Sequence, residues 1–310
     1  MRYVITGIAG FIGSHLAETL VAAGHDVVGV DCITEYYDPR LKEENAAPFE
    51  VLRTDLAEGS IDGLLAKADG VFHLAGQPGV RSFGDVFPQY VRHNLLATQR
   101  VFESAAAAGV RVVFASSSSI YGEAESYPTG EDAVPRPISP YGITKLGCEH
   151  LARAYTKGFG LDVVALRYFT VYGPRQRPDM AFARIAGALA TDTSFEVYGD
   201  GSQTRGFTYV SDAVAATILA MDRAPAGAVY NIGGGSEASV NDVIGIFEHV
   251  SGRRLAVRHL PGIPGDVRRT SADISRIAGE LGWWPLTELE QGVSAQWEWA
   301  RAHSAPVTAA

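Results

Sequence analysis

Two side chains with complementary chemistry, Tyr141 and Lys145, lie four residues apart just after Ser139 and Pro140. This spacing places both side chains on one face of a helix. A phenol has an ordinary pKa of about 10, and a nearby ammonium group favours its ionised form. The pair therefore indicates a proton acceptor for a hydroxyl group whose carbon loses a hydride.

A run of serines, residues 116–119, follows the predominantly apolar residues 112–115. We expect residues 111–117 to form a strand of a parallel sheet. The hydroxyls would then lie at the carboxyl end of that strand, where ligands bind in such sheets, and could face the same cleft as Tyr141. A run of serines also suits a simple turn, and this interpretation stays open.

Gly7, Gly10 and Gly13 stand between a predicted strand, residues 3–6, and a predicted helix, residues 11–23. Glycine permits a tight turn there and lets the free N–H groups of the helix N-terminus approach a pyrophosphate. The spacing differs from the commoner G-x-G-x-x-G, and a glycine turn alone can be merely structural. A second feature is needed to favour a dinucleotide.

Asp31 supplies that feature, because it ends the next predicted strand, 24 residues after Gly7. An acidic side chain at this place binds the ribose hydroxyls of the adenosine. Its charge would repel the 2′-phosphate of NADP, so the pattern predicts NAD. Asp55, after the third predicted strand, is a further candidate, although both aspartates also suit ordinary turns.

These groups need a scaffold, and the first half of the chain alternates short β-branched runs with helical patterns. The alternation predicts an α/β fold, a Rossmann-type doubly wound parallel sheet with a smaller C-terminal α/β substrate lobe. Gly24 and Gly109 end the clearest helical patterns, residues 11–23 and 88–108. The predicted strands are residues 3–6, 26–31, 50–52, 70–75, 111–117, 162–169 and 228–232, and a further helix is predicted at 211–221.

The alternation breaks after Tyr172, Gly173 and Pro174, where arginines and prolines become frequent. We therefore predict two domains. The dinucleotide-binding domain comprises residues 1–172 plus about 207–235, and the nucleotide-sugar-binding domain comprises about 173–206 plus 236–310.

Composition excludes several other classes of function. With 26 Lys and Arg against 35 Asp and Glu, the net charge of −9 argues against a nucleic-acid surface. Cys32, Cys148 and the eight histidines show no metal-binding spacing. No apolar run reaches the roughly 20 residues of a membrane helix, and no targeting segment is evident. We expect a cytoplasmic protein that uses no metal, nucleic acid or membrane.

The motifs together resemble those of the extended short-chain dehydrogenase/reductases that act on nucleotide sugars. Over nearly the whole chain the order is GIAGFIGSHL, HLAG, SSSSIYG, SPYGITK, LRYFTVYGP, DGSQTRGFTYVSD and NIGGG. The resemblance implies that Ser117 polarises the reacting oxygen, that Tyr141 is the base, and that Lys145 supports Tyr141 and holds the nicotinamide ribose. The residues expected at the NAD cofactor are Gly7, Gly10, Phe11, Ile12, Gly13, Asp31, Asp55, Leu56, Leu74, Ala75, Gly76, Asn94, Tyr141, Lys145 and Tyr168.

Two further segments, residues 35–42 (EYYDPRLK) and 170–181 (TVYGPRQRPDMA), look like those of UDP-glucuronate 4-epimerases in particular. By this resemblance Arg177 and Arg205 approach the UDP portion, and Tyr198 lies near the uracil. The alternative is that they are solvated arginines and a core tyrosine. Residues 263–266 (IPGD) replace the Arg-x-Gly-Asp phosphate contact of galactose epimerases, so Arg268 or Arg269 would have to supply the charge.

The family contains epimerases, dehydratases, decarboxylases and reductases. Dehydratases resemble one another in a Thr-Asp-Glu triplet after the fifth strand, whereas Ser117, Ser118 and Ser119 offer no carboxyl group for that chemistry. We therefore expect inversion of C4 of UDP-glucuronate, giving UDP-galacturonate through a 4-keto intermediate. The alternatives are a UDP-glucose/galactose 4-epimerase, a UDP-glucuronate decarboxylase and a non-catalytic dinucleotide sensor.

Such an epimerase must also keep the C6 carboxylate, which is β to a ketone once C4 is oxidised. Neutral donors can fix its orientation through charge-assisted hydrogen bonds. Ser118, Ser119 and Thr170 are the expected donors, and Thr170 stands where galactose epimerases and decarboxylases usually carry Asn. The alternative is that Thr170 only packs and the serines only cap a turn. The resemblance also implies a homodimer formed through helices near 90–108 and 141–157.

Overall fold

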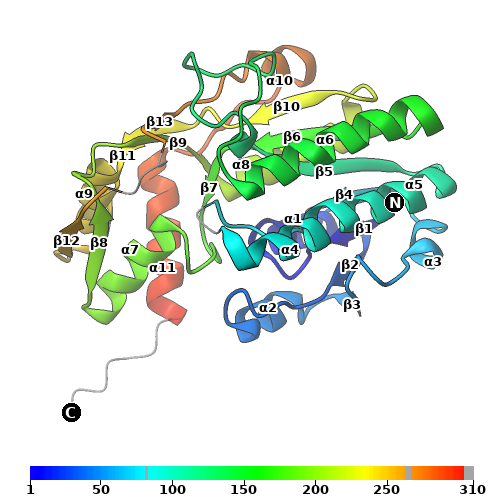
Figure 1. Cartoon of the computed structure of the whole chain (residues 1–310). Coiled ribbons are helices and arrows are strands. Elements are labelled where there is room, and N and C mark those ends of the chain that lie inside the picture. The colour runs from blue at the N-terminus through cyan, green and yellow to red at the C-terminus, as the bar shows by residue number, and fades with distance from the viewer. Residues whose placement is uncertain (81–82, 263–266, 304–310) are drawn as a thin grey trace.

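The structure is a computed structural model that describes residues 1–80, 83–262 and 267–303. Its largest sheet has seven strands in the order β10-β6-β5-β4-β1-β2-β3, and every neighbouring pair is parallel (Figure 1). The chain runs from β1 to one edge and then from β4 to the other, which confirms the predicted doubly wound fold. The strands are β1 Arg2–Thr6, β2 Asp26–Asp31, β3 Glu50–Arg53, β4 Gly70–His73, β5 Arg111–Ser117, β6 Val163–Tyr168 and β10 Val229–Ile232.

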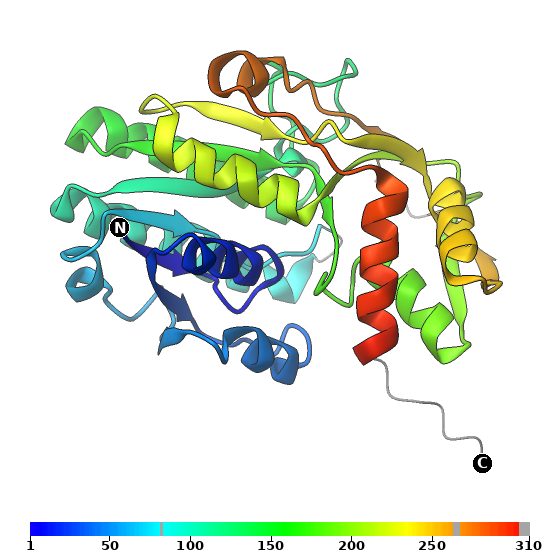
Figure 2. The same ribbon diagram turned by 180° about the vertical axis from the view of Figure 1, so that it is seen from behind.

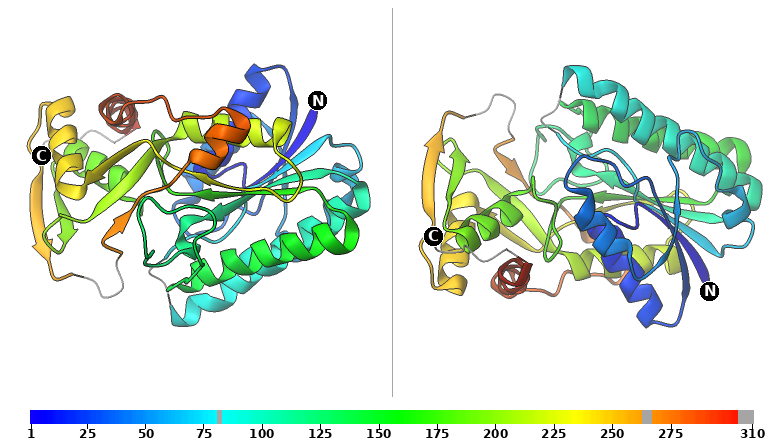
Figure 3. Two further views of the ribbon diagram at one scale, coloured as in Figure 1. Left: turned by 90° about the horizontal axis from the view of Figure 1, so that it is seen from above. Right: turned by 90° about the horizontal axis from the view of Figure 1, so that it is seen from below.

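Helices cover both faces of this sheet (Figures 2 and 3). On one face α1 (Phe11–Ala22) and α8 (Val210–Arg223) pack in a core with Tyr3, Phe72 and Tyr230. On the other face α5 (Ala97–Ala108) and α6 (Pro140–Phe159) form a second core. The central strands are therefore apolar on both sides, as parallel sheets require. Shorter helices are α2 Pro39–Ala46, α3 Asp62–Leu65 and α10 Ser275–Leu281.

The predicted helix at residues 88–108 is helical throughout but changes its winding. It begins as α4 (Phe87–Tyr90), continues as a π-helical segment (Val91–Leu96) and becomes α5, which ends at Gly109 in the left-handed conformation. π-Helical turns are often found at functional sites. In this segment the adjacent residues His93 and Asn94 have different surroundings. His93 lines the cavity described below, whereas Asn94 is fully buried.

A smaller lobe is built around β9 (Thr204–Tyr209), which pairs with three other strands. Helices α7, α9 and α11 surround it and share an apolar core with Phe182, Phe247 and Trp297. A separate pair, β8 and β12, extends this lobe (Figure 1). Its elements are β7 Thr170–Tyr172, β8 Ser194–Tyr198, β11 Ser236–Ser239, β12 Ala256–Leu260, β13 Arg269–Thr270, α7 Ala181–Thr191, α9 Val240–Ser251 and α11 Leu289–His303.

Strand pairing near the predicted domain boundaries has its own pattern. β7 and the whole of β9 belong to the second sheet, although residues 170–172 and 207–209 were expected with the dinucleotide-binding domain. Conversely, Ile277, Leu281 and Trp283 pack in the core beside α1 and α8. The division into residues 1–172 plus 207–235 and 173–206 plus 236–310 remains a prediction. In the described parts of the chain, no helix combines the length and apolarity needed to cross a membrane.

Candidate active site

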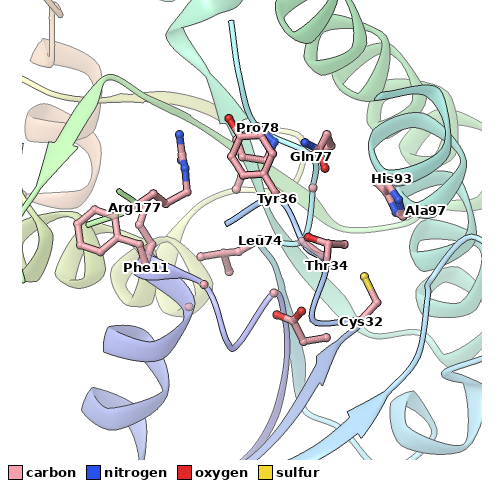
Figure 4. A pocket seen from close by; sticks show the side chains of 18 of the residues that line it. Phe11, Cys32, Thr34, Tyr36, Leu74, Gln77, Pro78, His93, Ala97 and Arg177 are labelled. Atoms are coloured by element: carbon pink, nitrogen blue, oxygen red, sulfur yellow. The ribbon is translucent and has the colours of Figure 1, made fainter. Parts of the chain in front are cut away.

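One elongated cavity lies at the carboxyl ends of β1, β2, β4 and β5. This is where the strand order reverses between β1 and β4, the usual ligand site of such sheets. Figure 4 shows Phe11 and Arg177 at one end of the view and His93 and Ala97 at the other, with Leu74 between them. The cavity therefore extends from the glycine turn to the π-helical segment.

The glycine turn is closed by its own backbone. The amide of Gly10 donates to the carbonyl of Gly7 at 3.0 Å, and the amide of Ser14 donates to Gly10 at 3.0 Å. A Cβ on Gly13 would lie only 2.1 Å from the Gly7 oxygen, so no larger residue fits this turn. All three glycines line the cavity at the N-terminus of α1. The arrangement matches a phosphate cradle.

Asp31 reaches the cavity from the end of β2 and also braces the glycine turn. Its Oδ2 accepts from the amide of Ala9 at 3.1 Å, and its Oδ1 accepts from the amide of Ile33 at 2.9 Å. Burial raises the pKa of Asp31, although these bonds and Lys42 act in the opposite direction. A carboxylate has about four acceptor positions, so Asp31 keeps acceptor capacity for a ribose diol.

Asp55 lies at the other end of the cavity and is fixed by charged neighbours. Its Oδ1 accepts from the amide of Ala57 at 2.8 Å, and Arg92 Nε donates to Oδ2 at 2.8 Å. Burial alone would raise the pKa of Asp55, but these bonds and His93 outweigh it and lower the pKa. Asp55 therefore stays ionised beside Leu56, which lines the same cavity.

The three predicted catalytic residues, Ser117, Tyr141 and Lys145, all line this cavity. Ser139 caps α6 by accepting from the amide of Gly142 at 3.1 Å, which places Tyr141 in the first turn. The Lys145 ammonium lies 6.0 Å from the centre of the Tyr141 ring and donates to the carbonyl of Ala115 at 2.7 Å. An ammonium has three donors, so Lys145 keeps two for other partners.

Ser117 ends β5 and forms a local pair with Ser119. Its hydroxyl donates to Ser119 Oγ at 3.1 Å and accepts from the Ser119 amide at 3.1 Å. Ser118 and Ser119 belong to a short 3-10 turn and are half-buried. Among the described residues that line the cavity, Ser117 is present, whereas Ser118 and Ser119 are not.

Asn94 supports the wall of the cavity instead of lining it. Its Oδ1 accepts from the amide of Gln77 at 2.8 Å, and its Nδ2 donates to the carbonyl of Gln77 and to Thr144 Oγ1. A Cβ on Gly76 would lie 2.9 Å from Asn94 Oδ1 and 3.4 Å from Lys145 Nζ. This close approach explains why glycine precedes Gln77 in this chain. Apart from Asn94, all fourteen residues predicted for the cofactor line the cavity.

The predicted substrate residues fall into three places. Arg177 lines the main cavity. Thr170 begins β7, is half-buried and pairs with Phe207 of β9, outside the set of described residues that line the cavity. Arg205 lies on β9, where its Nη1 donates to the carbonyl of Thr204 at 2.8 Å. Arg205 precedes Phe207, the partner of Thr170, by two residues on β9. Since a strand rises about 3.3 Å per residue, Thr170 and Arg205 lie near the same part of this strand.

Tyr198 and Arg268 line a second hollow at the ends of β8 and β12, together with Gln203. Arg269, the other arginine considered, is instead paired with Glu237, with Nε 2.7 Å from Oε1. Arg268, and not Arg269, is therefore the arginine of this pair that lines the hollow. Residues 263–266, where the usual phosphate contact is replaced, lie outside the described residues.

A model of the NAD dependent epimerase/dehydratase family matches residues 3–233. The chain belongs to this family. Tyr141, Lys145 and the glycine turn all lie within the matched segment, and all line the one cavity. Membership and the seven-stranded sheet agree with the resemblance seen in the sequence motifs.

Individual members of the family are similar over nearly the full chain. An uncharacterized UDP-glucose epimerase of Bacillus subtilis is 40% identical, over 95% of this chain and 96% of its own length. A UDP-glucuronate 4-epimerase of Thermodesulfobacterium geofontis is 36% identical, over 96% of each chain. The solved UDP-glucuronic acid 4-epimerase of Bacillus cereus, in complex with UDP-glucuronic acid and NAD, is 40% identical with a TM-score of 0.94, covering 97% of this chain and 99% of that one.

Several residues that line the cavity of this epimerase/dehydratase family member were not predicted. The main group, Thr34, Tyr36, Tyr37 and Lys42, comes from the segment after β2. The sequence carried a signal for Tyr36, Tyr37 and Lys42, because residues 35–42 follow Asp31 closely and resemble those of UDP-glucuronate 4-epimerases. The other unpredicted lining residues include Cys32, Gln77, Pro78, His93, Ser116 and Met180.

Proposed function

We propose that this chain is an NAD-dependent UDP-glucuronate 4-epimerase, which interconverts UDP-glucuronate and UDP-galacturonate through a 4-keto intermediate. The observation that carries the proposal is that Ser117, Tyr141 and Lys145 share one cavity with the glycine turn and Asp31. The relatives named as UDP-glucuronate 4-epimerases support the choice of sugar. The enzyme is accordingly an isomerase that needs an internal oxidant.

NAD, when bound, supplies the group that accepts hydride from C4 and returns it. The residues present fit this cofactor, because Gly13 leaves room that a Cβ would fill and Asp31 offers acceptor oxygens at the end of β2. The carboxylate of Asp31 favours a ribose with a free 2′-hydroxyl over one that carries a phosphate.

In this proposal the side chains move one proton and orient one oxygen. Tyr141 removes the proton from the C4 hydroxyl, and the positive charge of Lys145 stabilises the resulting phenolate. The Ser117 hydroxyl donates to the same oxygen, for which it must turn away from Ser119. The 4-keto sugar then rotates within the site, so that C4 is reduced on its opposite face and Tyr141 returns the proton.

The C6 carboxylate must be held so that the C5–C6 bond does not align with the C4 carbonyl. We propose Ser118, Ser119 and Thr170 as its donors, which requires these half-buried side chains to face the sugar when it binds. Neutral hydroxyl groups suit this task, since they bind a carboxylate without delivering a second negative charge.

For the nucleotide portion we propose that Tyr198 contacts the uracil and that Arg177, Arg205 and Arg268 approach the diphosphate. The hollow lined by Tyr198 and Arg268 supports this assignment. So does the pairing of β7, β9 and β13, which brings Thr170, Arg205 and Arg268 to one small sheet or its margin.

We also propose a homodimer joined through α4, α5 and α6. Apolar side chains stand exposed on these helices, including Phe87 at 43% and Ile143 at 53%, and Leu96 of the π-helical segment between α4 and α5 is 41% exposed. Ala105, in contrast, is fully buried within its own subunit, so the contact would use other residues of α5. A cytoplasmic location stays a prediction from the sequence.

The deciding experiment is incubation of the purified protein with UDP-glucuronate and NAD, followed by chromatographic separation of the nucleotide sugars. UDP-galacturonate is the expected product. UDP-pentose as the main product would identify a decarboxylase, and conversion of UDP-glucose but not UDP-glucuronate would identify a UDP-glucose/galactose 4-epimerase. Binding of NAD without turnover of either sugar would identify a non-catalytic dinucleotide sensor. Such a sensor would not need the proton acceptor Tyr141.

A further inference from the structure

Two segments far apart in the chain meet at the solvent edge of the main cavity. One follows β2 and carries Tyr36, and the other precedes α7 and carries Arg177 and Asp179. The Tyr36 hydroxyl donates to Asp179 Oδ2 at 3.3 Å, across 143 residues of sequence. Arg177 donates to both oxygens of Asp179 at 3.0 Å, from Nε and from Nη2. Tyr36 and Arg177 line the cavity (Figure 4), whereas Asp179 is exposed.

The Tyr36 segment is fixed by a buried lysine. Lys42 is only 6% exposed, and its ammonium donates to the carbonyl of Thr34 at 2.5 Å and to its hydroxyl at 2.8 Å. The same ammonium lies 4.4 Å from the centre of the Tyr37 ring. Asp38 caps α2 by accepting from the amide of Arg40. The segment therefore holds its shape before anything binds in the cavity.

The Arg177 segment is fixed by a buried glutamine. Gln176 donates to the carbonyl of Val171 at 2.9 Å and accepts from the amide of Ala183 at 3.0 Å. Gln296 of α11 donates to the same Gln176 oxygen and accepts from the amide of Gly173. Arg177 thus projects from a rigid segment, and only its side chain needs to move.

The charges explain what Asp179 does in this arrangement. It is an internal anion on Arg177, which has five N–H donors and therefore keeps some for another anion. Burial and the nearby carboxylate of Asp179 raise the pKa of Tyr36 to about 12, so its hydroxyl remains a donor at any physiological pH. Together the three side chains link the segment after β2 to the segment before α7.

We propose that Tyr36, Asp179 and Arg177 form a clasp that closes the cavity over the bound nucleotide sugar and retains the 4-keto intermediate until it is reduced. Asp179 is a positioning residue, because it holds Arg177 toward the anionic substrate and ties it to Tyr36. This inference rests on the proposed epimerase function and extends it to the retention of the intermediate.

Failure of the clasp has a chemical signature. If the 4-keto uronate is held loosely, the C5–C6 bond breaks, CO2 leaves and C5 takes a proton. The hydride taken from C4 then has no sugar to return to, so one NADH is left for each CO2 and UDP-4-keto-pentose formed. NADH and CO2 should therefore accumulate together in clasp variants.

The test uses Tyr36→Phe, Asp179→Ala, their double variant and Asp179→Glu, with Glu35→Gln as the control. Glu35 is exposed and adjacent to Tyr36, so its variant removes a nearby negative charge without touching the clasp. For Asp179→Ala we expect the UDP-glucuronate KM to rise roughly tenfold, the effect of one lost charge-assisted hydrogen bond, with a smaller loss in kcat. NADH per turnover should rise in Tyr36→Phe and in Asp179→Ala. Asp179→Glu keeps a carboxylate and should recover part of the substrate affinity lost in Asp179→Ala.

The double variant gives the sharpest result. Because Tyr36 acts through Asp179, Tyr36→Phe should add little once Asp179 is alanine. Additive effects on KM, or NADH and KM values equal to those of Glu35→Gln and the unmodified enzyme, would overturn the clasp. Binding of UDP and UDP-glucuronate by calorimetry is measured in parallel. An unmodified enzyme that does not convert UDP-glucuronate would instead overturn the proposed function.

Discussion

Tyr141 is the residue on which the proposed reaction depends most directly, because no other phenol lining the described cavity is paired with Lys145 on one helix face. Tyr141→Phe should lower turnover by at least about 100-fold, as loss of a general base usually does, while NAD binding persists. Tyr155→Phe is the matched control, since Tyr155 lies on the same helix and its hydroxyl accepts from Gln99, away from the residues that line the cavity. Steady-state turnover and NAD titration check both variants, and substantial residual activity in Tyr141→Phe would exclude it as the base.

Thr170 tests how the carboxylate is held. Thr170→Val should raise the KM for UDP-glucuronate about tenfold and release some CO2 and UDP-4-keto-pentose with NADH left behind, because valine keeps the shape but not the donor. Thr208→Val on the neighbouring strand is the control, since its buried hydroxyl has no hydrogen-bond partner among the described residues. If Thr170→Val epimerises UDP-glucuronate normally and forms no UDP-4-keto-pentose, Thr170 does not contact the carboxylate.

At the scale of elements, a buried ion pair joins α6 to the sheet beneath it. Arg167 of β6 donates to Glu149 of α6 from Nη2 at 2.7 Å, and Ser116 of β5 donates to the same carboxylate. Burial alone would lower the pKa of Arg167, but its bonds to Glu149 and Tyr121 raise it, so the charge persists. The helix of Tyr141 and Lys145 is thereby fixed against the strand end that carries Ser117.

A second contact joins α1 to the segment before α7. His15 Nε2 donates to the carbonyl of Pro174 at 2.9 Å, and Arg175 donates to His15 Nδ1 at 3.0 Å. The histidine is therefore neutral in the fold. Burial and the charge of Arg175 lower the pKa of His15 to about 4.

This lowered pKa makes stability depend on pH. Between about pH 6.5 and pH 4 the unfolded chain binds a proton at His15 that the folded chain does not. The contribution of His15 to the free energy of unfolding is therefore fully present above pH 6.5 and is lost as the pH falls toward 4. The contribution of His15 is on the order of 2 kcal/mol, after allowing for its partial exposure. His15→Gln should flatten this part of the profile, measured by urea unfolding at several pH values. His303→Gln, at an exposed position, is the control. An unchanged slope in His15→Gln would contradict the assignment.

At the scale of the whole molecule, the proposed dimer surface can be separated from the active site. Ile143 lies on α6 between Tyr141 and Lys145, yet it is 53% exposed. Ile143→Glu would bury a charge in a dimer contact and should give a monomeric mass at micromolar concentration. Leu286→Glu, at a position 84% exposed outside α4 to α6, should leave the mass unchanged. Sedimentation velocity distinguishes the two, and an unmodified protein that is already monomeric would contradict the dimer.

Features that depend on local spacing could be predicted from the amino-acid sequence alone. The glycine turn, Asp31 at the end of β2 and the pairing of Tyr141 with Lys145 were all predicted, and all line the cavity. Alternating apolar runs and Gly24 and Gly109 likewise predicted the sheet and the ends of its helices. These features follow from backbone sterics and from periodicities of two and 3.6 residues, which act within a few residues of each other.

Contacts between residues that are distant in the sequence became known only from the folded structure. It placed Asn94 behind the cavity wall, moved β7 into the second sheet and brought Tyr36 to Asp179 across 143 residues. No local pattern encodes such contacts, because each depends on how both lobes pack and on which buried donors and acceptors must be satisfied. Local sequence motifs therefore predicted the type of reaction, whereas the packing of the two sheets determined which side chains surround the site.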